Sequence, residues 1–134
     1  MIIRTTDNKR YVDVGKSDSM YSLYSTISML VLPNNQEICK AVDFIKEGKC
    51  TCDNALDTAR EMNRVRDLLS QIPPTDVIYD MQDLSKKAPW SDNISPVVTS
   101  CGNLFLTADG KDLLFELVSL LTYSYYGKSD IIFE

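Results

Sequence analysis

The start of the chain has the polar and apolar pattern of a β-hairpin. β-Branched residues at positions 2, 3 and 5 are followed by Asp7 and Asn8, two residue types that tolerate the left-handed backbone conformation of a tight turn. Aromatic and β-branched residues resume over residues 11–14, and Gly15 ends the run. We therefore predict two short antiparallel strands joined by a tight turn.

Apolar residues at spacings of three and four predict three helices in the next part of the chain. The first is capped by Ser17 or Ser19 and stops at Pro33, and the second opens at Asn34 or Asn35 and ends at Gly48. The third opens at Thr51 or Asp53 and stops at two consecutive prolines, Pro73 and Pro74. Each stripe gives its helix one face for the core.

The C-terminal part combines strand-like and helix-like runs. We predict a strand over residues 103–107, a turn with Asp109 as the helix cap, and a helix that ends at Gly127. Its inner side comprises Leu113, Leu114, Leu117, Leu120, Leu121 and Ser124. This stripe is wide, which indicates the most buried helix of the protein. Residues 131–133 then form a strand, expected to pair in parallel with residues 103–107 through a right-handed crossover.

Together these elements predict an α+β fold in a single domain that covers residues 1–134. We expect a small sheet, made of the N-terminal hairpin and the C-terminal strands, packed against three to four helices. A chain of 134 residues buries enough apolar surface to fold without a disulfide or a metal ion.

The segment of residues 75–100 lacks helical periodicity, although residues 77–79 have the composition of a short strand. A long irregular segment in a compact protein is often functional. Aromatic anchors and acidic side chains are typical of an interface with a cationic partner, and this segment carries both. We predict a partner-binding site at Tyr79, Asp80, Asp83, Trp90 and Asp92. The alternative is that Trp90 fills the core beneath the loop.

Charge and composition favour a protein partner over nucleic acid. The chain has 19 acidic and 14 basic residues and a formal net charge of −5, so it repels phosphate backbones and anionic membranes. We predict neither nucleic-acid nor membrane binding. The N-terminus lacks a basic segment followed by an apolar one, and no apolar run reaches the length of a membrane span. We therefore expect the protein in the cytoplasm.

The sequence lacks the usual catalytic chemistry. It contains no histidine, which removes the commonest general base and metal ligand, and no glycine-rich phosphate loop. The pairs of Asp80 with Asp83 and of Asp109 with Asp112 are better explained as solvated loop charges and a helix cap. The four cysteines do not have zinc-site spacing and are expected to be free thiols. We predict no catalytic residue, no metal site and no cofactor.

The C-terminal part resembles small immunity proteins of bacterial polymorphic toxin systems, including those of contact-dependent growth inhibition. The resemblance covers about residues 54–134 and rests on two runs: ALDTAREMNRVRDLLSQIPPTDVIYDMQDL and NLFLTADGKDLLFELVSLLTYSYYGKSDIIFE. They combine an amphipathic helix, a strand with an Asp-Gly turn, a leucine-rich helix and a short end strand. These motifs are structural, so no functional residue is carried over by position.

The resemblance implies a cytosolic inhibitor without enzymatic activity that binds one cognate toxin domain, often a basic nuclease. Charge complementarity with such a nuclease would speed association and add selectivity. Two alternatives remain open at this point: a small cytosolic enzyme that uses carboxylates or a cysteine, and an adaptor whose partner is not a toxin. The sequence leaves the oligomeric state undetermined.

Overall fold

The computed structural model describes all 134 residues, and its four short strands and four α-helices confirm the predicted α+β class. The strands are β1 (Ile2–Thr5), β2 (Tyr11–Asp13), β3 (Lys49–Cys50) and β4 (Ile131–Phe133). The helices are α1 (Ser17–Thr26), α2 (Cys39–Glu47), α3 (Cys52–Leu69) and α4 (Leu113–Gly127). None of the helices has the length and apolarity needed to traverse a lipid bilayer.

The predicted N-terminal hairpin is present. β1 and β2 pair antiparallel, with Ile3 opposite Val12, and both of these side chains are buried. Asn8 takes the left-handed conformation of the turn, with a φ of 62°. Tyr11 and Asp13, on either side of Val12, are exposed. The hairpin therefore buries one face and leaves the other in solvent.

The sheet has the strand order β2-β1-β4-β3, and all of its pairs are antiparallel. The predicted parallel crossover is therefore wrong. β4 returns between β1 and β3, with Ile131 opposite both Thr5 and Cys50. The sequence did not reveal β3, which has only two residues and lies between two helices. Two residues are too few to show the alternation of apolar and polar side chains that marks a strand.

Two other predicted strands are not formed. Residues 77–79 lie outside the sheet, and residues 103–107 contribute only one isolated bridge, between Leu106 and Asp112. Both runs are apolar because they cover the core as loops: Val77, Leu104 and Phe105 contact it or belong to it. Apolar composition alone does not separate such a loop from a strand.

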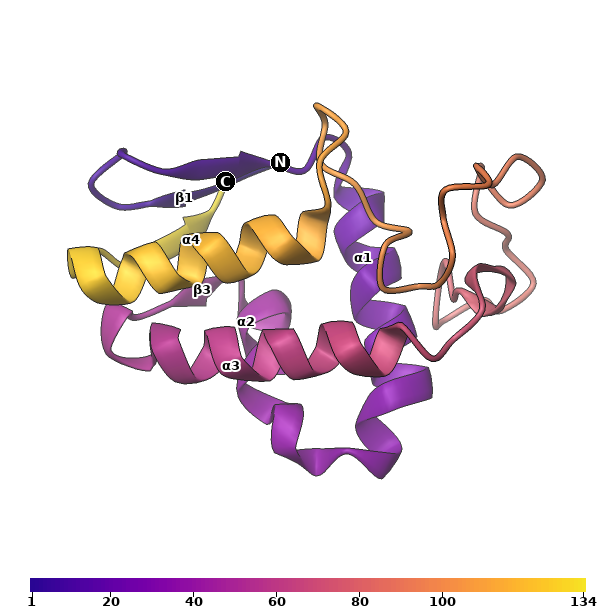
Figure 1. Ribbon diagram of the computed structural model, residues 1–134, viewed down its shortest axis with the longest axis horizontal. Helices are drawn as coiled ribbons and strands as arrows, with labels where there is room; N and C mark the ends of the chain where they lie inside the picture. Colours follow the sequence, from indigo (N-terminus) through magenta and orange to yellow (C-terminus); the bar gives the residue numbers. More distant parts are fainter.

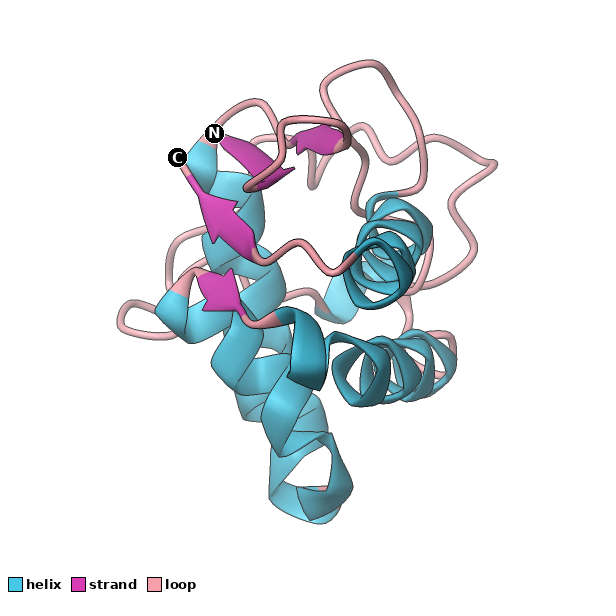
Figure 2. Ribbon diagram, turned by 90° about the vertical axis from the view of Figure 1, so that its left-hand side faces the viewer, coloured by secondary structure: helices cyan, strands magenta, loops and turns pink.

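The core lies between the sheet and the helices, and α4 is its centre. Figures 1 and 2 show α3 and α4 side by side, and Figure 1 shows that they run in opposite directions. The five leucines predicted for the inner face of α4 are all buried, and Leu113, Leu114, Leu117 and Leu121 are fully inaccessible. They pack in one cluster with the α3 stripe that includes Met62 and Val65.

Distant carboxylates cap several helices. Asp130, just before β4, accepts a hydrogen bond from Cys52 N at 2.8 Å at the start of α3, and Glu61 of α3 accepts one from Lys40 N at 2.7 Å at the start of α2. These bonds satisfy amide groups that a helix leaves free at its N-terminus. They also tie together segments that are far apart in the sequence.

The ends of α4 differ from the prediction. Asp112, and not Asp109, caps it by accepting a hydrogen bond from Phe115 N at 3.1 Å. Gly127 is its last helical residue, and Lys128 takes the left-handed position with a φ of 53°. Asp109 and Gly110 instead form a turn before the helix, because Gly110 N donates to Thr107 O at 3.0 Å.

Asp7 gives the hairpin a specific dependence on pH. Its carboxylate accepts hydrogen bonds from Thr5 Oγ1 at 2.6 Å, Lys9 N at 2.9 Å and Tyr123 Oη at 2.9 Å. These bonds, with that of Thr5 the largest contribution, lower the pKa of Asp7 from 3.8 to about 2. A lowered pKa in the folded state means that the ionised group stabilises the fold above pH 3.8 and that this stabilisation is lost as the pH falls towards 2.

Asp7→Asn is therefore expected to unfold at a lower temperature than the unmodified chain at pH 7. The difference between the two melting temperatures should shrink as the pH falls from 3.8 to 2, measured by circular dichroism. Asp43→Asn is the matched control, because Asp43 is exposed. A difference for Asp7→Asn that stays constant down to pH 2 would contradict the assignment of these hydrogen bonds to the ionised carboxylate.

Candidate functional site

The segment predicted to bind a partner is held on the side of α1 by buried hydroxyl groups. Ser22 Oγ donates to Ile78 O at 2.8 Å, and Ile78 N donates to Thr26 Oγ1 at 3.1 Å. Met81 N donates to Ser25 Oγ at 3.2 Å. In Figure 1 the segment runs beside α1, away from the sheet. These bonds replace the strand pairing expected for residues 77–79 and fix the backbone that carries the predicted site.

The two predicted aromatic anchors lie in contact. The rings of Tyr79 and Trp90 meet edge to face, with centroids 5.9 Å apart. Tyr79 Oη donates to Asp18 Oδ2 at 2.6 Å, and this bond raises the pKa of Tyr79 and lowers that of Asp18. Trp90 is half-buried and lies outside the hydrophobic core. It therefore packs on the tyrosine and does not fill the core.

The indole of Trp90 also has an unsatisfied polar atom. Its Nε1 is buried and has no hydrogen-bond acceptor. Burying a donor without a partner costs about 1–3 kcal/mol. This cost makes the present position of the ring less stable than its contact with Tyr79 alone would suggest.

The three predicted acidic residues have different environments. Asp80 accepts from Gln82 N at 2.9 Å and lies 3.5 Å from Lys86 Nζ, and these contacts, the backbone bond first, lower its pKa. Asp83 is exposed and accepts from Ser85 N at 3.2 Å. Asp92 is exposed, and neither Asp83 nor Asp92 forms an ion pair. Asp80 thus shapes the turn, while the other two present free negative charge.

The sequence did not reveal that residues of α1 lie beside the predicted site and contact it. Asp18 and Tyr21 lie on α1 next to the segment. Asp18 accepts a hydrogen bond from Tyr79, and burial, followed by the charge of Asp80, raises the pKa of Tyr21. The available signal was the group of three hydroxyl residues, Ser22, Ser25 and Thr26, which the helix buries beside Met20 and Leu23. Buried hydroxyls require partners, and here the partner is the segment.

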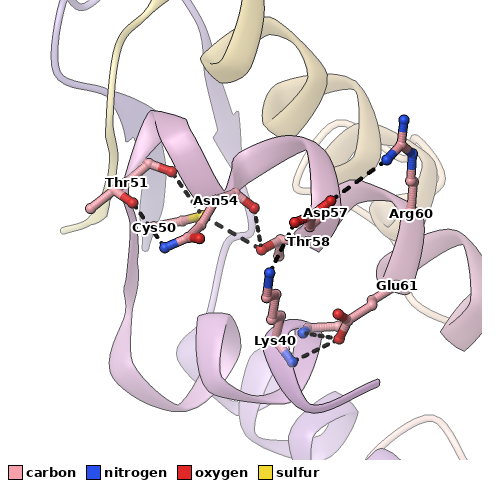
Figure 3. Close-up of polar contacts among 9 residues, drawn as sticks. Lys40, Cys50, Thr51, Asn54, Asp57, Thr58, Arg60 and Glu61 are labelled. Carbon is pink, nitrogen blue, oxygen red and sulfur yellow. Dashed lines mark hydrogen bonds and ion pairs between the residues drawn. The ribbon is translucent and has the colours of Figure 1, made fainter. Parts of the chain in front are cut away.

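A second polar network joins α2 to α3 (Figure 3). Lys40 Nζ lies 2.9 Å from Asp57 Oδ2, and Arg60 lies 3.6 Å from the other oxygen of that carboxylate. Glu61 caps α2 beside them. Lys40 also borders a hollow of about 390 Å³, and Cys50 is among the residues that line it. The Lys40–Asp57 pair connects α2 to α3, whereas Arg60 and Asp57 lie on the same helix. Both pairs are solvent-exposed and therefore add little stability.

The four cysteines are all free, and burial makes Cys50 and Cys101 poor nucleophiles. Burial is the main cause that raises the pKa of Cys50 and that of Cys101, the latter to about 11. Thiols with raised pKa values are protonated near neutral pH and react slowly as nucleophiles. Cys52 is half-buried and Cys39 is exposed. No group of three or more cysteine, aspartate and glutamate side chains is arranged to hold a metal ion.

Asp80 and Asp109, one residue of each predicted carboxylate pair, have lowered pKa values, which disfavours a role as general acid. The pKa of Asp109 is lowered, mainly by the hydrogen bond from Thr107, as is the pKa of Asp80. Asp112 caps α4 and lies 3.0 Å from Arg66. A general acid needs a raised pKa to be protonated at neutral pH. These aspartates serve structure in the fold described above.

The comparison with known proteins gives one match. The model of the family described as Immunity protein 70 matches residues 5–133. No curated protein and no solved structure matches the chain. The family match begins at the last residue of β1 and covers β2, β3, all four helices and the returning strand β4, so it includes most of the N-terminal half, in which the sequence itself showed no resemblance. The chain therefore belongs to the Immunity protein 70 family.

Proposed function

We propose that this protein neutralises one cognate toxin domain by binding it in a stable complex. The observation that carries the proposal is the family match over residues 5–133. The raised thiol pKa values and the lowered carboxyl pKa values support binding over catalysis. The protein acts in the cytoplasm, where its four free cysteines suit a reducing compartment.

The binding face is the segment that carries Tyr79, Asp80, Asp83, Trp90 and Asp92. Its backbone is anchored on α1, so its aromatic pair is already ordered before the partner arrives. An ordered anchor loses less conformational freedom on binding than a mobile one. The indole Nε1 is buried without an acceptor in the free protein, so a carbonyl group of the toxin can accept its hydrogen bond only after the ring turns outward on binding.

The partner is a basic protein domain, and a nuclease is the class that suits it best. Nucleases bind phosphate backbones with cationic surfaces, and the chain carries a net charge of −5. Asp83 and Asp92 add exposed, unpaired negative charge to the same segment. Such charges at the rim of an interface mainly speed association and reject partners of the wrong sign.

The double variant Asp83→Lys with Asp92→Lys tests this face. We expect it to associate with the purified toxin domain about tenfold more slowly at low salt, with a smaller loss at high salt. It should also protect cells less well when co-expressed with the toxin. Surface plasmon resonance at two salt concentrations measures the first effect, and growth curves measure the second.

The matched control is Asp43→Lys with Glu47→Lys on α2, which makes the same change in net charge at two exposed positions. If both double variants slow association equally, the overall charge matters and the proposed face does not. If the unmodified chain forms no complex with the toxin domain encoded beside its gene and gives no protection, the proposed function is wrong.

A further inference from the structure

The outer edge of β2 has backbone groups without partners. Thr5 N donates to Arg10 O and Val14 N donates to Met1 O, each at 3.0 Å. The backbone N–H and C=O groups of every second residue, from Arg10 to Val14, therefore point towards β1. The backbone groups of Tyr11 and Asp13 therefore point to the open side of the sheet, where no further strand pairs. Only Asp13 O is used there, by Ala108 N at 2.8 Å. Tyr11 N–H, Tyr11 C=O and Asp13 N–H remain open.

A hollow of about 480 Å³ lies along this edge, and we name it the edge groove. It is lined by β2, by the turn that contains Ala108 and Asp109, and by Glu116 on the first turn of α4. Three carboxylates line it, those of Asp13, Asp109 and Glu116, against one lysine, Lys111. The edge groove is thus negative as well as rich in free backbone groups.

An exposed aromatic side chain stands at the rim of the edge groove. Tyr11 is 68% exposed although it lies in a strand. Tyrosine is enriched at protein interfaces because it offers a large rigid surface with one polar atom. Natural sheets protect an open edge with short strands, covering loops, lysine, proline or a bulge. β2 is only three residues long and the turn at Ala108 lies against Asp13, which leaves Tyr11 as the uncovered position of this edge.

We propose that the edge groove binds an extended, cationic segment of the toxin domain as a short added strand. This inference rests on the proposed function and names a second contact surface for the same partner. Backbone bonds to Tyr11 and Asp13 would hold the segment, and a lysine or arginine of that segment would face Asp109 and Glu116. Ala108 already uses one backbone group of this edge in the same way.

The edge groove and the segment of residues 77–92 flank the same end of α1. Gly15 packs on Ala108, with 3.7 Å between an ideal Cβ at that glycine and the alanine Cβ, and Asp18 binds Tyr79. In Figure 1 the turn that contains Ala108 rises beside the start of α1. One toxin domain can therefore contact both surfaces. A second copy of this chain suits the edge groove less well, because it would bring two sets of the same carboxylates together.

Tyr11→Pro with Tyr11→Val as its matched control tests the added strand. Proline removes the open N–H and leaves the bonds of β2 to β1 in place, whereas valine keeps the N–H. We expect Tyr11→Pro to bind the purified toxin domain at least about tenfold more weakly than Tyr11→Val. In the unmodified complex, the amides of Tyr11 and Asp13 should exchange hydrogen more slowly than in the free chain.

The outcomes separate this inference from the proposed function. If the unmodified chain binds the toxin domain, but the proline and valine variants bind equally and the two amides are not protected, the edge groove is not a contact surface and the proposed function stands. If the proline variant fails to fold, hydrogen exchange in the unmodified complex decides alone. If the two amides are protected without toxin and the free chain sediments as a dimer, a second copy occupies the edge and this inference is wrong.

Discussion

Leu117→Ala is expected to lower the free energy of unfolding by about 2–5 kcal/mol. Leu117 is fully inaccessible at the centre of α4, where it packs in the core shared with α3. Removing its side chain loses buried apolar area and leaves a cavity between the two helices. Since a domain is stable by only about 5–15 kcal/mol in total, this single change removes a large share of the stability.

Urea unfolding followed by circular dichroism measures this effect as a lower transition midpoint with an unchanged slope. Tyr126→Ala is the matched control on the same helix, because Tyr126 is 71% exposed, and it is expected to change the stability by no more than about 0.5 kcal/mol. Equal losses for the two variants would mean that the α3 and α4 pair is not the centre of the core.

Trp90→Ala is expected to weaken binding of the cognate toxin domain by about 2 kcal/mol, which is about thirtyfold in the dissociation constant. The indole is the largest side chain of the proposed face and contacts Tyr79 in an ordered pair. It lies outside the hydrophobic core, so the variant should keep its fold. Isothermal titration calorimetry with the purified toxin domain measures the loss.

Trp90→Phe is the informative control for the same position. It keeps an aromatic ring against Tyr79 but removes the Nε1 donor, which has no acceptor in the free protein. An intermediate loss is expected if the toxin accepts that hydrogen bond. Affinities within twofold of the unmodified chain for both variants would exclude Trp90 from the interface.

The helices and the hairpin were predictable because their signals are local. The leucine spacing of α4, the stripe of α3 and the turn at Asn8 each depend on residues within a few positions of one another. Core positions such as Leu117 and Met62 follow directly from that periodicity.

The sheet order and the helix caps were not predictable, since they depend on contacts between distant residues. β4 pairs with β1 and β3 across the whole chain, and a two-residue strand such as β3 has no pattern of its own. Asp130 caps α3 from 78 positions away. An aspartate that precedes a strand gives no local indication that it caps a helix elsewhere in the chain.

The proposed site was partly predictable. Aromatic and acidic residues in a long irregular segment suggested an interface, and the structure brings Tyr79 and Trp90 into contact. The sequence did not reveal that α1 supplies Asp18 and three hydroxyl groups to this region. Nor did it reveal the edge groove, which forms only when the turn at Ala108 packs against β2.

We infer that this member of the Immunity protein 70 family inhibits by occupying its toxin and not by modifying it. The decisive experiment titrates a fixed amount of purified toxin domain with increasing amounts of the chain and follows the residual toxin activity. We expect activity to fall linearly and to reach its end point at one chain for each toxin, with full recovery after the two are separated. Inactivation of excess toxin by a small fraction of the chain, persisting after separation, would show that the chain modifies its toxin.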